Sequence, residues 1–145
     1  MTEAVRLLDA NVLVALALDT HVHHRAAHEA LRASTWRWAT TPVTESALVR
    51  LLLNGAVTGA EFTGQQVLTQ LAAMRRHARW TFLPDDTSPI TARIDLSVLV
   101  GFRQVTDLHL VEVAARHGAV LATFDAGIVP VLAPRDRCHV VVLPI

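Results

Sequence analysis

The sequence predicts an α/β protein in which helices cover both faces of a parallel β-sheet. Short apolar runs rich in Val, Leu, Trp and Phe alternate with segments of helical periodicity along the chain. Alternating strands and helices of this kind favour a parallel sheet. The chain has 145 residues, enough for one sizeable hydrophobic core and too few for two ordinary ones, so we expect a single domain over residues 1–145.

Five apolar runs are the expected strands, and helices with recognisable ends separate them. The strands are expected at residues 5–8, 36–39, 80–83, 119–123 and 139–143. The helices are expected at residues 11–19, 23–33, 42–53, 63–78, 89–101 and 107–117, with a short helical turn after residue 125. Thr41 before Pro42 is typical of a helix start, and Gly118 directly follows the last long helix. Residues 84–89 have the composition of a loop.

The charged residues exclude several classes of protein. The formal net charge is zero, so any binding of nucleic acid must come from local basic patches. All 13 basic residues are Arg and none is Lys. Haloacid-dehalogenase-type phosphatases and response-regulator receivers also place aspartates at strand ends, but their patterns include a site lysine. A P-loop nucleotide site is excluded as well, because its glycine- and lysine-containing motif is absent.

The apolar residues and the cysteine count predict a cytoplasmic protein. The longest unbroken apolar run, residues 12–18, is far shorter than the roughly 20 residues that span a membrane. No signal peptide is recognisable. The single cysteine, Cys138, cannot form an internal disulfide, which agrees with a reducing compartment.

Four acidic residues lie where expected strands end or where the following helices begin. Asp9 ends the first strand, Asp125 ends the fourth, Glu45 lies early in the helix after the second, and Asp107 begins a helix. Taken alone, Asp107 can favour a helix N-terminus and Asp125 can be a turn residue. Asp9 is harder to explain in that way, because its only sequence-local cation is Arg6. All four carboxylates are expected to gather at the carboxyl edge of the sheet.

Carboxylates that gather in this way need protons or a cation. Two of them about 5 Å apart repel by about 3 kcal/mol at an effective dielectric constant of about 20. Mg²⁺ and Mn²⁺ take oxygen ligands of this kind. Such a site suits the hydrolysis of phosphodiesters, because the metal lowers the pKa of a bound water and a further carboxylate can accept the proton.

Four stretches together resemble a PIN domain, specifically the VapC-type ribonuclease toxins of bacterial toxin–antitoxin systems. They are LLDANVLVAL, TTPVTESALVRLL, VTDLHLVEVAARHGAVLATFD and VVVLPI. The resemblance covers essentially the whole chain and implies a three-layer α/β/α fold with a parallel sheet of about five strands in the order 3-2-1-4-5. It also implies an endoribonuclease that depends on Mg²⁺, or on Mn²⁺, and that a cognate antitoxin protein neutralises.

The resemblance also assigns roles to residues of this chain. It places the catalytic acidic quartet at Asp9, Glu45, Asp107 and Asp125. Within this quartet, Asp9 and Asp107 are expected as the principal metal ligands, and Asp125 and Glu45 complete the site directly or through water. Asn11 and Thr123 match polar positions that support the site by hydrogen bonding.

Two arginines are candidates for binding the RNA backbone: Arg50, on the Glu45 helix, and Arg103, just before Asp107. A second basic cluster, formed by Arg75, Arg76 and Arg79, is explained at least as well by its place at a helix C-terminus.

The remaining features favour structural interpretations. His24 and His28 have a spacing that could bind zinc, but a surface or helix-start position is favoured. Trp36 and Trp38 are expected to pack in the core rather than to stack on bases.

The apolar helix at residues 11–18 fits deep burial or a surface covered by a partner, and we expect in part the second, a groove for an antitoxin and a homodimer contact. The alternative function is a non-catalytic, metal-binding protein-interaction domain.

Overall fold

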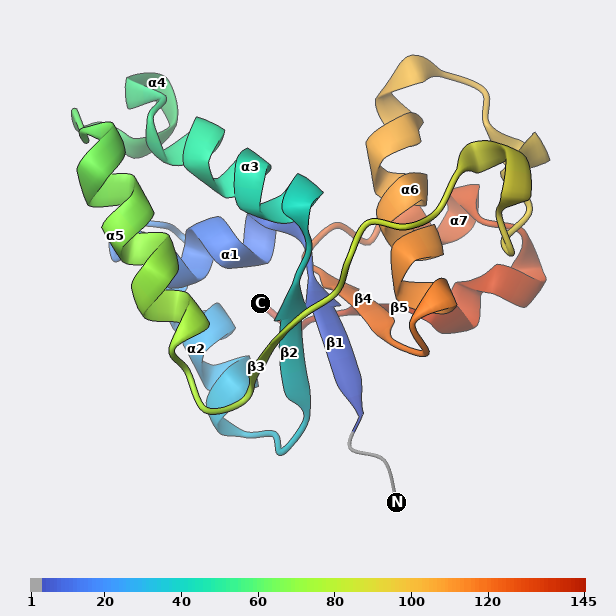
Figure 1. Cartoon of the computed structure of the whole chain (residues 1–145), viewed down its shortest axis with the longest axis horizontal. Helices are drawn as coiled ribbons and strands as arrows, with labels where there is room; N and C mark the ends of the chain where they lie inside the picture. The colour runs from blue at the N-terminus through green and yellow to red at the C-terminus, as the bar shows by residue number, and fades with distance from the viewer. Residues whose placement is uncertain (1–3) are drawn as a thin grey trace.

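A five-stranded parallel sheet forms the centre of the molecule in a computed structural model that describes residues 4–145 (Figure 1). The strands are β1 (Val5–Leu8), β2 (Arg37–Thr40), β3 (Trp80–Phe82), β4 (Val120–Thr123) and β5 (Val140–Val142). They lie in the order β3-β2-β1-β4-β5, and every neighbouring pair is parallel. The predicted α/β class and the strand order implied by the PIN resemblance are therefore confirmed.

Helices cover both faces of this sheet, which gives three layers (Figure 1). One face carries α1 (Ala10–Ala17), α2 (His24–Arg32), α3 (Pro42–Leu52) and α5 (Gly64–Arg75), with the short α4 (Gly55–Thr58) between α3 and α5. The other face carries α6 (Val105–Arg116) and the short α7 (Ile128–Val131).

The alternation of side chains along the strands divides the apolar core into two parts. Leu8 of β1 and Trp38 of β2 point to the α1 side and pack in one cluster. Their neighbours Leu7 and Ala39 point to the α6 side and pack in the other, together with Leu121 of β4. Successive residues of a strand face opposite ways, so the near-continuous apolar strands of this chain fit a sheet buried on both faces.

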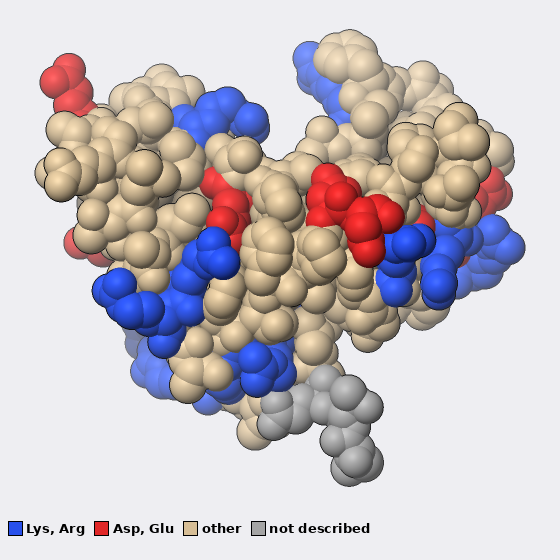
Figure 2. Space-filling model, viewed as in Figure 1, with Lys and Arg blue, Asp and Glu red and all other residues tan. Residues whose placement is uncertain are grey.

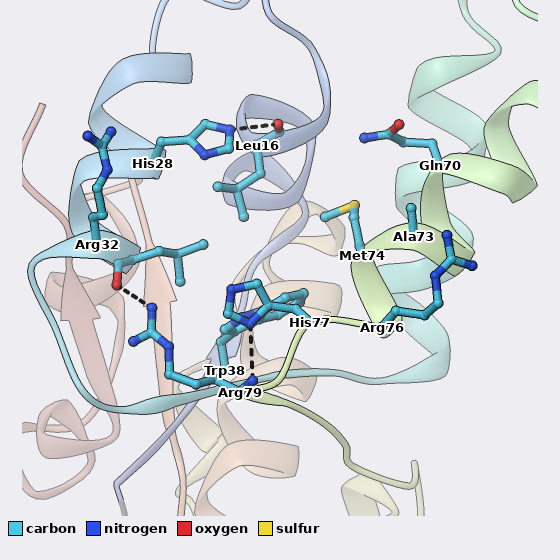
Figure 3. Close-up of a pocket in the computed structure, with 11 residues that line it drawn as sticks. Leu16, His28, Arg32, Trp38, Gln70, Ala73, Met74, Arg76, His77 and Arg79 are labelled. Atoms are coloured by element: carbon cyan, nitrogen blue, oxygen red, sulfur yellow. Dashed lines mark hydrogen bonds between the residues drawn. The ribbon is translucent and has the colours of Figure 1, made fainter.

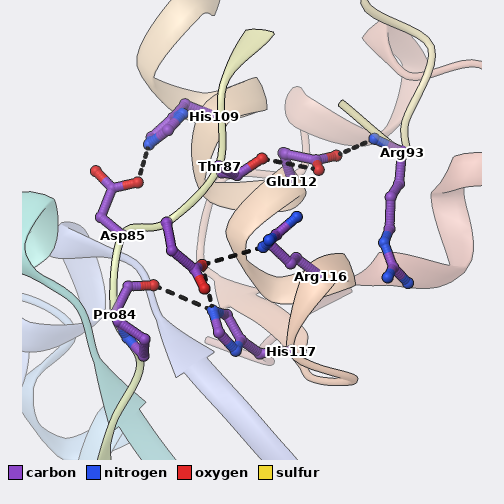
Figure 4. Close-up of polar contacts among 9 residues, drawn as sticks. Pro84, Asp85, Thr87, Arg93, His109, Glu112, Arg116 and His117 are labelled. Carbon is purple, nitrogen blue, oxygen red and sulfur yellow. Dashed lines mark hydrogen bonds and ion pairs between the residues drawn. The ribbon is translucent and has the colours of Figure 1, made fainter. Parts of the chain in front are cut away.

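The predicted helix at residues 89–101 is wrong. This segment instead holds two short 3-10 turns, η1 (Pro89–Thr91) and η2 (Leu96–Val98), and a third turn, η3 (Phe102–Gln104), leads into α6. Its backbone N–H groups are used by side chains from elsewhere in the fold. Arg93 N donates to Glu112 Oε2 at 2.9 Å (Figure 4). Ile94 N donates to the same oxygen at 3.0 Å, and Asp95 N donates to Asp136 Oδ2 at 2.9 Å. Tertiary hydrogen bonds therefore replace the helical ones that the apolar spacing predicted.

Hydrogen bonds and ion pairs at several residues hold the connection between β3 and α6 against α6 (Figure 4). The imidazole of His109 lies 2.9 Å from Asp85, and that of His117 lies 2.8 Å from Asp86 and 3.1 Å from the carbonyl oxygen of Pro84. Because both neighbours of His117 Nε2 are acceptors, this nitrogen carries a proton. The predicted loop at residues 84–89 is confirmed as far as Ser88, after which Pro89 begins η1, and it is held against α6 by these contacts.

Smaller differences concern the ends of elements. The helix α4 and the 3-10 turn η4 (Pro134–His139) were not predicted. Cys138 and His139 lie in η4 and not at the start of β5, and α6 begins two residues before Asp107. The helix start at Thr41 and Pro42 is confirmed, but the Thr41 hydroxyl makes no capping hydrogen bond and is buried without a partner among residues 4–145. None of the helices within residues 4–145 combines the length and apolar character that crossing a bilayer requires.

The helix α1 does not offer the partner surface that we expected in part. Its residues Val12 to Leu16 are all buried against the rest of the chain, and Leu18 is also buried. They pack with Leu31 of α2 and Leu48 of α3. The alternative of deep burial therefore holds, because α2 and α3 already cover the apolar faces of α1.

Candidate active site

Asp9 lies between β1 and α1 at the carboxyl edge of the sheet. Its side chain is almost completely buried, with 7% of the residue exposed. Asp9 Oδ1 accepts a hydrogen bond from Ala10 N at 2.7 Å, and Oδ2 accepts one from Thr123 Oγ1 at 2.8 Å. Burial raises the pKa of Asp9, an effect that these two hydrogen bonds oppose and the nearby charge of Asp125 reinforces.

The hydroxyl of Thr123, the last residue of β4, joins three polar groups of the site. It accepts hydrogen bonds from Asn11 Nδ2 at 3.1 Å and from Asp125 N at 3.0 Å. Since both of these groups are donors, the single hydroxyl proton is left for Asp9. Asn11 Oδ1 accepts a hydrogen bond from Phe124 N at 3.3 Å, which fixes the orientation of the Asn11 amide. Asn11 and Thr123 thus connect the loops that carry Asp9 and Asp125.

The carboxylates of Asp9, Asp107 and Asp125 are near enough to influence one another. Burial, and then the charges of Asp9 and Asp125, raise the pKa of Asp107 to about 6. Within residues 4–145, no hydrogen bond or ion pair neutralises the Asp107 side chain. Asp125 is exposed, and its Oδ1 accepts a hydrogen bond from Gly127 N at 2.8 Å, so Asp125 also stabilises a turn. The structure therefore brings three of the four predicted carboxylates together.

Glu45 is held by different partners on the β2 side of the same edge. Its Oε2 accepts a hydrogen bond from Thr40 Oγ1 at 2.5 Å, and its Oε1 lies 3.5 Å from Arg75 Nη1. The charge that raises the pKa of Asp9 is that of Asp125, and the charges that raise the pKa of Asp107 are those of Asp9 and Asp125, so Glu45 contributes to neither shift. Glu45 thus belongs to the same edge of the sheet but is compensated by its own cation.

The donor set suits a hard divalent cation that keeps some of its water. Among residues 4–145, no group of three or more His, Cys, Asp or Glu side chains is arranged closely enough to hold a metal ion without further ligands. Mg²⁺ is usually bound through one or two carboxylates, with water and substrate phosphate in the remaining positions. Asp9, Asp107 and Asp125 supply oxygen ligands only. Burial and the charges of Asp9 and Asp125 raise the pKa of Asp107, and a bound cation would relieve the repulsion between these charges.

The pKa of Asp107 predicts how the stability of the metal-free protein depends on pH. Between about pH 4 and about pH 6, the folded state binds more protons at Asp107 than the unfolded state does. Asp107 therefore lowers the free energy of unfolding as the pH rises through this window. Urea unfolding of the wild-type protein and of Asp107→Asn should show the variant gaining relative stability with rising pH. Parallel pH dependences would contradict this prediction, since the carboxyl groups that do not interact with Asp107 cancel in the difference.

Basic side chains stand on both sides of these carboxylates. Figure 2 shows a hollow between the lobe that contains α3 to α5 and the lobe that contains α6. Acidic atoms lie at the bottom of this hollow, and basic atoms lie on both of its sides. Arg50 and Glu45 line one hollow of about 720 Å³, and Arg103 lines a cavity of about 200 Å³ with Asp107 and Asp125. Both predicted RNA-binding arginines therefore lie beside predicted acidic residues.

The remaining predicted candidates lie away from the three aspartates. His24 Nδ1 and His28 Nε2 lie 2.7 and 3.1 Å from the carbonyl oxygens of Ala15 and Leu16, which agrees with their structural interpretation. Trp38 is buried in the core, and Trp36 packs partly buried against it with Arg6 over its ring. Arg6 therefore does not compensate Asp9.

A separate hollow of about 480 Å³ lies between α2, α5 and β2 (Figure 3). Arg76, His77 and Arg79 line it. Arg79 donates to the carbonyl oxygens of Leu31 and Ser34, both at 2.6 Å, so its place in the predicted basic cluster is structural.

Sequence reasoning missed the residues that hold Glu45. Thr40 is an ordinary strand residue by its sequence, and Arg75 is explained equally well by its place at the end of a helix. Their contacts with Glu45 join segments that lie five and 30 residues from it in the chain. The only available signal was that Thr40 ends a strand at the same edge as Asp9 and Asp125.

The fold and the site define an α/β protein with acidic residues at the carboxyl edge of a parallel sheet, supported by strand-end hydroxyl and amide groups. The chain matches the PIN domain family over residues 6–131. It is 41% identical over 140 residues to ribonuclease VapC38 of Mycobacterium tuberculosis, a match that covers 96% of this chain and 98% of the relative. The protein belongs to the PIN domain family.

Two further comparisons agree with this assignment. Ribonuclease VapC39 of Mycobacterium tuberculosis is 44% identical over 124 residues, which is 84% of this chain and 89% of the relative. The crystal structure of VapC20 from the same organism, described as a sarcin-ricin loop cleaving toxin, has a TM-score of 0.54 and 12% identity. It covers 86% of this chain and 92% of that chain and shows a shared fold.

Proposed function

We propose that the protein is a metal-dependent endoribonuclease, the toxin of a type II toxin–antitoxin system acting in the cytoplasm. The observation that carries this proposal is the group of Asp9, Asp107 and Asp125, whose mutual repulsion helps to raise the pKa of Asp107 to about 6. The names of the VapC relatives, which are ribonucleases, support it.

In this proposal the aspartates hold Mg²⁺, or Mn²⁺ in its place. Asp9 and Asp107 are the principal ligands, and Asp125 and Glu45 complete the site directly or through water. The bound metal supplies two things, a water of lowered pKa and positive charge for the scissile phosphate. Thr123 and Asn11 keep Asp9 oriented through their hydrogen bonds. Asp125 or Glu45 accepts the proton of the attacking water.

The test is cleavage of total RNA by the purified protein with Mg²⁺ or Mn²⁺, with a chelator, and after the metal is restored. We expect cleavage only when metal is present. Tight metal binding without cleavage, measured on total RNA from a native host as well as on synthetic RNA, would instead favour the non-catalytic interaction domain.

A cognate antitoxin and a second copy of the chain are the protein partners in this proposal. Large apolar side chains are exposed on the lobe of α3 to α5, among them Leu53, Val57, Phe62 and Leu68. Exposed apolar side chains on one lobe are a common feature of surfaces that a partner covers. They support a homodimer or a toxin–antitoxin hetero-oligomer whose contacts lie outside α1.

Arg103→Gln is expected to weaken the binding of RNAs of different sequence to the same extent. Arg103 lies beside Asp107 and Asp125, where the phosphate next to the scissile bond would lie. Removing one phosphate contact should reduce the slope of log affinity against log salt by about one. Binding to a labelled RNA, measured over a series of salt concentrations in the uncleaving Asp9→Asn background, reports this slope. The control Arg32→Gln, on α2, should leave the slope unchanged.

A further inference from the structure

Both carboxylate oxygens of Glu45 have a partner, and the partners come from different elements. Oε2 accepts the hydrogen bond from Thr40 at the end of β2. Oε1 faces the guanidinium of Arg75 at the end of α5. The Glu45 side chain is only 13% exposed, and Thr40 is completely buried. A carboxylate held at both oxygens cannot turn freely about its last bond.

The direction of the hydrogen bond from Thr40 is fixed by Trp80 of β3. Trp80 Nε1 donates to Thr40 Oγ1 at 2.9 Å. An indole N–H can only donate, and a hydroxyl has a single proton. Thr40 therefore accepts from Trp80 and gives its proton to Glu45, so that Trp80, Thr40 and Glu45 form a chain with one possible direction.

The ring of the same tryptophan also holds the second partner of Glu45. The guanidinium of Arg75 lies 4.5 Å from the ring centroid of Trp80 and 5.2 Å from that of Phe82. Stacking of this kind restrains a long, flexible side chain and leaves its N–H groups able to bind an anion. Trp80 thus supports Glu45 through two routes, its N–H by way of Thr40 and its ring face by way of Arg75.

We propose that Thr40, Trp80 and Arg75 form a positioning unit that fixes the Glu45 carboxylate at the edge of the active site. The inference rests on the proposed function, in which Glu45 works beside the three aspartates. The positioning unit explains how Glu45 keeps one orientation although Asp9, Asp107 and Asp125 do not contact it. None of the three residues needs to touch RNA for this role.

Thr40→Val tests the positioning unit most directly, because valine keeps the shape of threonine and removes the hydroxyl, and because a buried residue cannot contact the substrate. We expect kcat to fall by about 10-fold to 100-fold, the usual loss when the partner of a site residue is removed. The KM should change little, and Thr40→Ser should restore most of kcat. The control is Thr58→Val, which removes a buried hydroxyl near α4 that has no contact with Glu45.

A double-mutant cycle shows whether Thr40 acts through Glu45. In a Glu45→Gln background, Thr40→Val should cause little further loss of kcat, because the group that it positions is already altered. The inference is overturned if Thr40→Val cleaves RNA as fast as the wild-type protein. It is also overturned if Thr40→Val causes the same fold loss with and without the Glu45 carboxylate.

The indole N–H signal of Trp80 in an NMR spectrum gives a readout that does not need activity. Both Thr40→Val and Glu45→Gln should shift this signal, while the indole signals of Trp36 and Trp38 stay in place. If neither variant moves the Trp80 signal, the chain to Glu45 is absent and the inference is wrong. If the signal moves but the wild-type protein cleaves no RNA, the proposed function fails and the positioning of Glu45 stands.

Discussion

Asp9→Asn is expected to lower metal-dependent RNA cleavage by more than about 100-fold, since even the loss of a partner behind a metal ligand costs about 10-fold to 100-fold. Asparagine has the shape of aspartate, but its single amide oxygen can accept a hydrogen bond from Ala10 N or from Thr123 Oγ1, and not from both. It also lacks the charge that attracts a divalent cation, so the loss of cleavage follows from the loss of metal binding.

The same substitution should leave the thermal stability of the metal-free protein close to that of the wild-type protein, because two effects oppose each other. Burial raises the pKa of Asp9, which means that the ionised form is disfavoured in the folded state. The neutral amide removes this penalty and the repulsion from Asp125, but it loses one of the two hydrogen bonds that Asp9 accepts. A melting temperature close to that of the wild-type protein, together with lost cleavage, is therefore the expected pair of results.

Cleavage and melting temperature are measured on Asp9→Asn and on Asp19→Asn, which changes an exposed aspartate after α1 and should alter neither property. Cleavage that persists in Asp9→Asn, prepared identically, would point to a contaminating nuclease and would remove the basis of the proposed function. A melting temperature well below that of the wild-type protein would show that the negative charge of Asp9 is compensated within the fold.

Glu112→Ala is expected to cause the largest loss of stability, about 3 kcal/mol or more of the free energy of unfolding. Glu112 lies in the middle of α6 with 1% of its surface exposed. Its carboxylate accepts three hydrogen bonds. Those from Thr87 Oγ1 at 3.1 Å and from Arg93 N are seen in Figure 4, and the third comes from Ile94 N. Alanine leaves these buried donors without an acceptor.

Glu112→Gln is the matched variant and should lose much less stability. The amide oxygen can accept from both backbone N–H groups, and the amide nitrogen can donate to the hydroxyl of Thr87, which is able to accept. Urea unfolding of the two variants at neutral pH measures the difference. Equal losses in the two variants would mean that the negative charge of Glu112, and not its acceptor geometry, holds residues 87–94 against α6.

The hydrogen bonds of Glu112 explain why the helix predicted at residues 89–101 does not form. The apolar residues of this segment have a spacing compatible with a helix, and one of them, Ile94, is indeed buried. The acceptors for the backbone N–H groups of Ile94 and Asp95 come from α6 and η4, 18 and 41 residues further along the chain. The spacing of apolar residues along the sequence carries no information about distant hydrogen-bond acceptors, so it cannot show that they compete with the acceptors of a local helix.

In contrast, the local sequence does predict the arrangement at the edge of the sheet that carries Asp9 and Asp125. Strand ends are marked by the change from apolar runs to polar residues, and the carboxyl ends of parallel strands meet at one edge. The strand-end pattern therefore suffices to place Asp9 and Asp125 together, and the resemblance to PIN domains adds Asn11 and Thr123. The structure adds the bond directions, with the Thr123 hydroxyl donating to Asp9 and accepting from Asn11 and Asp125.

The sequence by itself determined the class of fold, the strand order through its family resemblance, and the candidate acidic residues, because these depend on periodicity and on residue type at the ends of elements. Only the tertiary structure decided that α1 is buried within its own chain and that Glu45 is compensated by Arg75 and Thr40. It also decided that a buried glutamate organises residues 87–94. These features depend on which distant side chains meet, and that is fixed by packing across the sheet rather than by any local pattern.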